Sequence, residues 1–197
     1  MLGVEETAVF GAVMRLADLL VIPSMVLASV GMPLISSFFA QGNKKLFEIT
    51  IKSISGVGLA SACIIYFIYL FFGEDIILLV FNETYVGGIS ALFWLSSAYL
   101  VHFAAGPTFD CFSMRNYHRV NIIVALSFMP AVLIFTYLGA QAGGITGASI
   151  GVFAAMLMRS TIATFLMYKY FHHTSLPSLS FQVYKTFINS WQFSNLK

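Results

Sequence analysis

The stretch from Val120 to Met158 contains no charged residue. As one continuous helix it would be roughly 58 Å long, nearly twice the ~30 Å hydrocarbon thickness of a lipid bilayer. Its middle, residues 139–144, reads GAQAGG, and a patch so rich in glycine disfavours a helix. We therefore predict two membrane-spanning helices joined by a very tight turn, with the other segments packed around this hairpin.

The composition of the whole chain also indicates that lipid is its main solvent. Of 197 residues, 59% are hydrophobic and 9% are charged, whereas typical globular proteins carry about 25% charged residues. The net charge is only +2 and no basic patch is interleaved with aromatic residues, so we expect no nucleic-acid partner. The sequence has no CxxC or HExxH spacing and no nucleophile–base arrangement, so we expect no metal, no cofactor and no enzymatic activity.

Five membrane-spanning helices are predicted from the apolar segments, which makes the fold class all-α. They form a membrane bundle within residues 1–171 and cover about residues 7–40, 53–72, 86–109, 120–138 and 145–171. We expect Pro23 and Pro33 to kink the first of these helices, because each removes a backbone donor inside it.

The connections between these spans are predicted from their polar residues. A loop is expected over residues 73–85, with its apolar middle at the membrane interface, and a polar loop over 110–119. Residues 172–197 are expected to form a cytoplasmic tail, either as an amphipathic helix lying in the interface or as a disordered segment.

The basic residues predict the orientation, because cytoplasmic loops of membrane proteins carry an excess of Lys and Arg. With five spans, all basic connections fall on one side of the membrane, and we place that side in the cytoplasm and the N-terminus outside. These residues are Lys44, Lys45, Lys52, Arg115, Arg119, Lys169, Lys185 and Lys197.

Arg15 and Asp18 lie three residues apart on one face of the first predicted span. If that span begins near residue 7, Arg15 is roughly 12 Å below the outer surface and Asp18 is nearer the midplane. Ionisable groups at such depth face a partner or a water-filled cavity. One interpretation is a cavity wall in which Arg15 attracts an anionic group such as a phosphate and Asp18 orients it. The other is a mutually neutralising pair with a structural role.

Two further candidates for the cavity lie in other spans. Arg159, in the fifth span, is either a second cationic cavity residue or a side chain that reaches toward nearby head groups, and we favour the latter. His102, in the third span, is more often a hydrogen-bonded interior histidine than a proton carrier. It is a weaker candidate.

Small residues recur every four positions at Gly143, Gly147, Gly151 and Ala155. At this spacing they form one smooth stripe that lets a neighbouring helix approach closely. We interpret the stripe as a surface for tight helix packing, and a substrate-facing groove is the less favoured alternative.

Several short motifs occur in an order known from one family of transporters. They are ETAVFGAVMRLA (6–17), PLIS (33–36), AQGN (40–43), FNETY (81–85), GP (106–107), MRNYHRVN (114–121) and GITGAS (144–149). Together they resemble the polysaccharide-export and O-antigen flippases of the multidrug/oligosaccharidyl-lipid/polysaccharide exporter superfamily. The resemblance covers about residues 3–171 and departs from the family pattern at 111–114, where the usual turn motif is replaced.

The resemblance implies a lobe of a lipid-linked oligosaccharide flippase in the bacterial cytoplasmic (inner) membrane. Members have two helical lobes, and this chain resembles the second from its second helix onward. The implied substrate is a polyprenyl-pyrophosphate glycan for polysaccharide, O-antigen or lipopolysaccharide synthesis, the implied driving force is an ion gradient, and Arg15 is the first candidate for the cavity cation.

Alternating access requires two bundles, so we expect the chain to be inactive without a first lobe supplied by the same or a separate chain. The chain would then be a fragment, a decayed gene product or half of a split transporter. One alternative is part of a multidrug and toxin extrusion exporter. Another is a non-transporting membrane scaffold for glycan-synthesis enzymes.

Overall fold

The structure is a computed structural model that describes residues 3–114, 118–171 and 176–177. This part of the chain is all-α. Its elements in order are α1 (Val4–Asp18), α2 (Val21–Ala40), α3 (Lys44–Val80), the 3₁₀ helix η1 (Glu83–Gly88), α4 (Ile89–Ala105), α5 (Thr108–Met114) and α6 (His118–Phe171). The predicted tail helix lies outside the described residues.

Within the described residues, four stretches are long and apolar enough to cross a membrane. They are Val4–Ala40, Lys44–Val80, Glu83–Ala105 and Arg119–Tyr170. Large apolar side chains cover their outer faces, and Phe71, Leu79 and Leu133 are 74%, 87% and 70% exposed. A surface this apolar over several helices is unsuited to water and suited to hydrocarbon.

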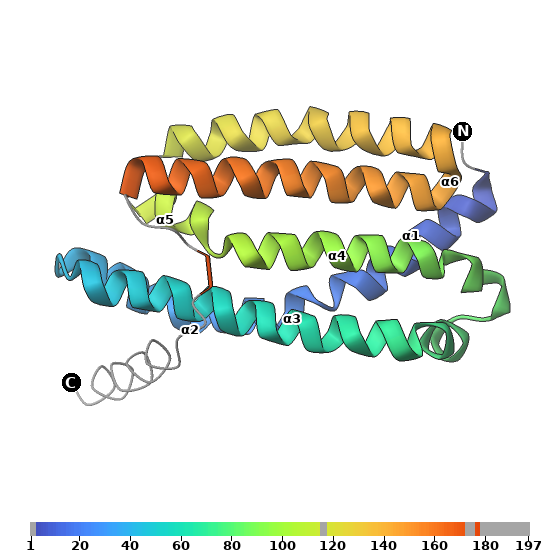
Figure 1. Ribbon diagram of the computed structural model, residues 1–197, viewed down its shortest axis with the longest axis horizontal. Helices are drawn as coiled ribbons and strands as arrows, with labels where there is room; N and C mark the ends of the chain where they lie inside the picture. The colour runs from blue at the N-terminus through green and yellow to red at the C-terminus, as the bar shows by residue number, and fades with distance from the viewer. Residues whose placement is uncertain (1–2, 115–117, 172–175, 178–197) are drawn as a thin grey trace.

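The longest helix, α6, reverses direction at Gly143 and Gly144. Gly143 has φ −152° and ψ 30°, and Gly144 has φ 58° and ψ −139°. The positive φ at Gly144 is a conformation that glycine adopts without a steric penalty. Figure 1 shows the two arms of α6 lying antiparallel. The predicted hairpin is therefore confirmed, with its turn inside the predicted glycine-rich patch.

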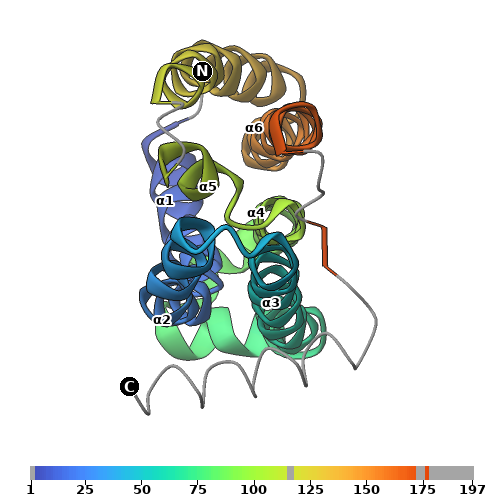
Figure 2. The ribbon, with the colours of Figure 1, turned by 90° about the vertical axis from the view of Figure 1, so that its left-hand side faces the viewer.

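Helix α4 occupies the centre of the bundle, between α3 and α6 (Figure 2). Trp94 of α4 meets Phe153 of α6 edge-to-face at 5.3 Å between ring centroids. One apolar core, which includes Val13, Tyr69 and Leu92, joins α1, α3 and α4. A second core joins the end of α2, the start of α3, α5 and the end of α6, and Phe112 is fully buried in it. The two cores lie at different levels along the bundle.

The first predicted span is two helices, with a break one turn before Pro23. The break lies at Leu19 and Leu20, and α2 continues through Pro33. Pro23 sits in the first turn of α2, where it has no N–H to donate to the carbonyl of Leu19 four residues earlier. That carbonyl instead accepts from the backbone N–H of Ile22 at 3.3 Å. The proline therefore acts one turn upstream of its own position.

Two predicted loops are also corrected. The loop expected over 73–85 is helical as far as Val80, because Gly73 and Ile77 are buried on one face of α3 while Glu74 and Asp75 point outward. The polar loop expected over 110–119 contains α5, and the preceding span ends at Ala105. Gly106, with φ 66°, and Pro107 stop that helix.

Candidate functional site

A cavity of about 300 Å³ lies where α2, α3, α4 and α6 meet. Ile54 of one apolar core and Phe103 of the other both line it. The cavity therefore separates the two cores. Its polar lining consists of Ser24, Ser55, His102 and Arg159.

The serines reach the cavity from the walls formed by α2 and α3. The Ser24 hydroxyl donates to the carbonyl of Val21 at 2.8 Å, and the Ser55 hydroxyl donates to the carbonyl of Ile51 at 3.0 Å. Such bonds satisfy a hydroxyl within its own helix and can be exchanged for a bond to another acceptor. Gly58 lies one turn after Ser55 and adds no side-chain bulk to this wall.

Arg159 lies deep within the second arm of α6. It is roughly 21 Å along the helix from the Gly144–Ile145 turn and roughly 15 Å from Lys169 at the other end. Its guanidinium carbon is 4.9 Å from the centroid of the Phe128 ring on the first arm. This cation–π contact gives the charge a favourable neighbour in apolar surroundings.

His102 enters the same cavity from the last turn of α4. Its ring contacts Phe103, with centroids 5.4 Å apart. The structure therefore brings together two of the sequence-predicted candidates, His102 and Arg159, that are far apart in the chain. An imidazole and a guanidinium at one cavity offer several N–H donors and one fixed positive charge.

Arg15 and Asp18 lie elsewhere, on the exposed face of α1. No ion pair joins Arg15 to Asp18, both of which belong to the described part of the chain. The carboxylate of Asp18 instead accepts a hydrogen bond from the Tyr99 hydroxyl of α4. Neither residue lines the cavity around Arg159.

The α1–α2 break is held by tyrosines from neighbouring helices. The Tyr69 hydroxyl of α3 donates to the carbonyl of Leu16 at 2.6 Å, and Tyr99 binds Asp18 two residues later. In hydrocarbon the polar groups at a helix break need protein partners, because no water is present, and the Leu16 carbonyl and the Asp18 carboxylate have them here. Neither tyrosine is identifiable from the sequence, because no local pattern distinguishes them from other tyrosines in the spans.

The small-residue stripe packs the two arms of α6 against each other. A Cβ atom at Gly147 would overlap the carbonyl group of Gly139, and one at Gly151 would overlap that of Phe135. Ala155 is fully buried. The predicted place of Gly143 in this stripe is wrong, because Gly143 lies in the turn and a Cβ there would meet nothing within 4 Å. Gly139 was missed, although it begins the glycine-rich patch.

A second cavity, of about 270 Å³, lies between the two arms of α6. Its lining is apolar except for Ser127 and Arg159. The apolar residues are Ile123, Val124, Phe128, Met158, Ile162 and Leu166. Arg159 therefore lines both this cavity and the one within the bundle.

The described residues contain no cluster of three or more His, Cys, Asp or Glu that could hold a metal ion. Neither a protein-family model, nor a curated protein, nor a solved structure matches the chain.

Proposed function

We propose that the chain is a helical lobe of a lipid-linked oligosaccharide flippase. In this proposal the cavity at Arg159 binds the phosphate-bearing head group of the carrier lipid. The observation that carries it is one polar cavity deep between long apolar helices, lined by Arg159, His102 and two serines. Ionisable groups at membrane depth mark substrate pathways by default. The cavity residue proposed is thus Arg159, while Arg15 was the first candidate from the sequence.

A phosphate or pyrophosphate suits this lining chemically. A guanidinium can donate two parallel N–H bonds to one phosphate group, and its charge is permanent. The imidazole of His102 can add a donor, and the serine hydroxyls can turn toward phosphate oxygens. A cavity with a fixed cation is poorly suited to the cationic drugs that multidrug exporters bind.

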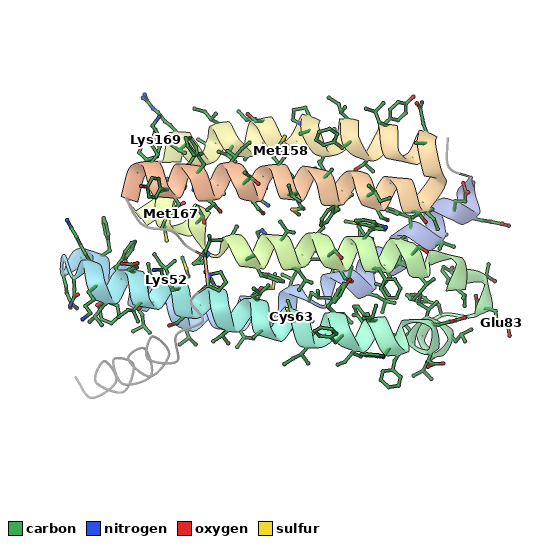
Figure 3. All side chains as sticks on the ribbon, viewed as in Figure 1. Lys52, Cys63, Glu83, Met158, Met167 and Lys169 are labelled. Atoms are coloured by element: carbon green, nitrogen blue, oxygen red, sulfur yellow. The ribbon has the colours of Figure 1, made fainter. Side chains whose placement is uncertain are left out.

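The distribution of charge along the bundle supports an orientation. Lys52 and Lys169 lie near one end and Glu83 lies at the other (Figure 3). Lys44 begins α3 at the basic end. Because cytoplasmic connections are enriched in Lys and Arg, we place the basic end in the bacterial cytoplasm and the α6 turn outside.

Transport in this proposal requires a second bundle from the same or a separate chain. Alternating access depends on two units that rock around a shared site. The first arm of α6 offers a broad apolar face, in which Ile123, Met129 and Leu133 are 63%, 65% and 70% exposed. In a bilayer that face contacts lipid or the second bundle.

The proposal is tested by equilibrium dialysis, which measures the binding of inorganic pyrophosphate to the purified chain in lipid nanodiscs. Hydrogen bonds to charged groups contribute about 1.5–3 kcal/mol each, so Arg159→Gln should weaken binding by roughly 10- to 150-fold. The affinity of Arg159→Lys should lie between those of the parent chain and Arg159→Gln, because lysine keeps the charge and loses the bidentate geometry. Arg119→Gln, at an exposed position near the start of α6, is the control. Equal affinity of Arg159→Gln and the parent chain would refute the proposed role of the cavity.

A further inference from the structure

The two arms of α6 are held together unequally along their length. Near the turn, glycines at 139, 147 and 151 bring the backbones into direct contact, with no room for a side chain. Away from the turn, the arms leave the cavity of about 270 Å³ between residues 123–128 and 158–166. The two arms are therefore in contact near the turn and separated by this cavity toward the basic end. We call this cavity the cleft.

We propose that this cleft holds the hydrocarbon tail of an anionic amphiphile whose phosphate lies at Arg159. The inference rests on the proposed function, because it takes the phosphate site in the inner cavity as given. It adds the route by which the tail leaves that cavity. The tail passes between the arms of α6 and reaches the bilayer from there.

The lining of the cleft matches a hydrocarbon tail. Its walls are Ile, Val, Met, Leu and Phe side chains, and the Phe128 ring lies beside Arg159 at the inner end. A volume of about 270 Å³ lies just below the range for ligand pockets, roughly 300–1,000 Å³. The cleft therefore suits part of a hydrocarbon chain and not a whole lipid.

Arg159 identifies the occupant, because it is common to both cavities. On one side of it lies a lining with serines and a histidine, and on the other lies an almost wholly apolar lining. A ligand that uses both can place an anionic group at the guanidinium and an apolar group beyond it. Amphiphiles with a phosphate head group have this order, and the membrane supplies them.

The inference is tested by filling the cleft without touching the head-group cavity. Ile162 is 39% exposed on the second arm, so Ile162→Trp should be tolerated while its ring enters the cleft. Ser127→Trp fills the cleft from the first arm and guards against failure of the other variant to fold. Leu126→Trp is the control, because Leu126 is 64% exposed and does not line the cleft.

Two probes are compared on each variant in nanodiscs, namely inorganic pyrophosphate and radiolabelled farnesyl pyrophosphate. The parent chain should bind farnesyl pyrophosphate at least tenfold more tightly than inorganic pyrophosphate. Both cleft-filling variants should lose this gain in affinity and should bind inorganic pyrophosphate as tightly as the parent chain does. Leu126→Trp should keep the gain. If pyrophosphate binding depends on Arg159 but the gain survives both cleft substitutions, the tail site is wrong and the proposed function stands. If pyrophosphate does not bind at all, both are wrong.

Discussion

The substitution Gly147→Ala tests whether the α6 hairpin is locked by backbone contact. A Cβ atom at this position would overlap the carbonyl oxygen of Gly139 and lie 2.9 Å from its carbonyl carbon. Real Cβ atoms essentially never come within 3.0 Å of another heavy atom, and the obstructing atoms are backbone. The arms would therefore have to separate to admit a single methyl group.

Two effects of opposite sign act in this variant. Replacing glycine by alanine within a helix is favourable by about 0.5–1 kcal/mol. Overpacking a tight contact costs about 1–3 kcal/mol, and sometimes more. The matched control is Gly11→Ala in α1, where a Cβ would meet nothing within 4 Å. Both variants gain the same helix preference of alanine over glycine, so this term cancels in the comparison. Gly147→Ala should therefore be less stable than Gly11→Ala by about 1–3 kcal/mol.

The free energy of unfolding can be measured by titration with a denaturing detergent in mixed micelles, followed by tryptophan fluorescence. Trp94 reports on the α4–α6 interface through its contact with Phe153. The chain has 2 tryptophans, so Trp191→Phe in every variant leaves Trp94 as the single probe. Equal stability of Gly147→Ala and Gly11→Ala would show that the arms are not in backbone contact.

Three further predictions concern the α1–α2 break. Tyr69→Phe should lower the free energy of unfolding by about 1 kcal/mol, because it removes a buried hydrogen bond, and the exposed Tyr137→Phe should change it by less than about 0.3 kcal/mol. Pro23→Ala restores a backbone donor, so the distance between spin labels on α1 and α2 should lengthen as the two helices straighten; an unchanged distance would mean that the proline does not set the break. A double-mutant cycle of Asp18→Ala and Tyr99→Phe should give a coupling of about 0.5–1.5 kcal/mol, and additive effects would contradict their hydrogen bond.

The hairpin was predictable because its two signals are local. The length of the charge-free stretch requires a reversal, and the glycines of residues 139–144 locate it. The break in the first span was misplaced by one turn, because the effect of Pro23 falls on the carbonyl of Leu19. The helical course of residues 73–80 depends on burial of Gly73 and Ile77 against α4. Such tertiary packing overrides the loop preference of the adjacent acidic residues.

The candidate site was only half predictable. Arg159 and His102 were identifiable as polar groups within apolar spans, as were Arg15 and Asp18. Which of these four share a cavity depends on how α4 and α6 pack, and periodicity within one helix does not contain that information. The tyrosines that support the α1–α2 break depend in the same way on contacts between helices.

In the proposed orientation, the basic end of the bundle lies on one side of the bilayer and the α6 turn lies on the other. This orientation is tested by single cysteines at Lys44 and at Ala142 in a chain whose own Cys63 and Cys111 are replaced by serine. A membrane-impermeant maleimide is then added to intact cells and to inverted vesicles. We expect Ala142→Cys to be labelled in cells and Lys44→Cys to be labelled only in inverted vesicles. Labelling of both positions from the same side would rule out this orientation.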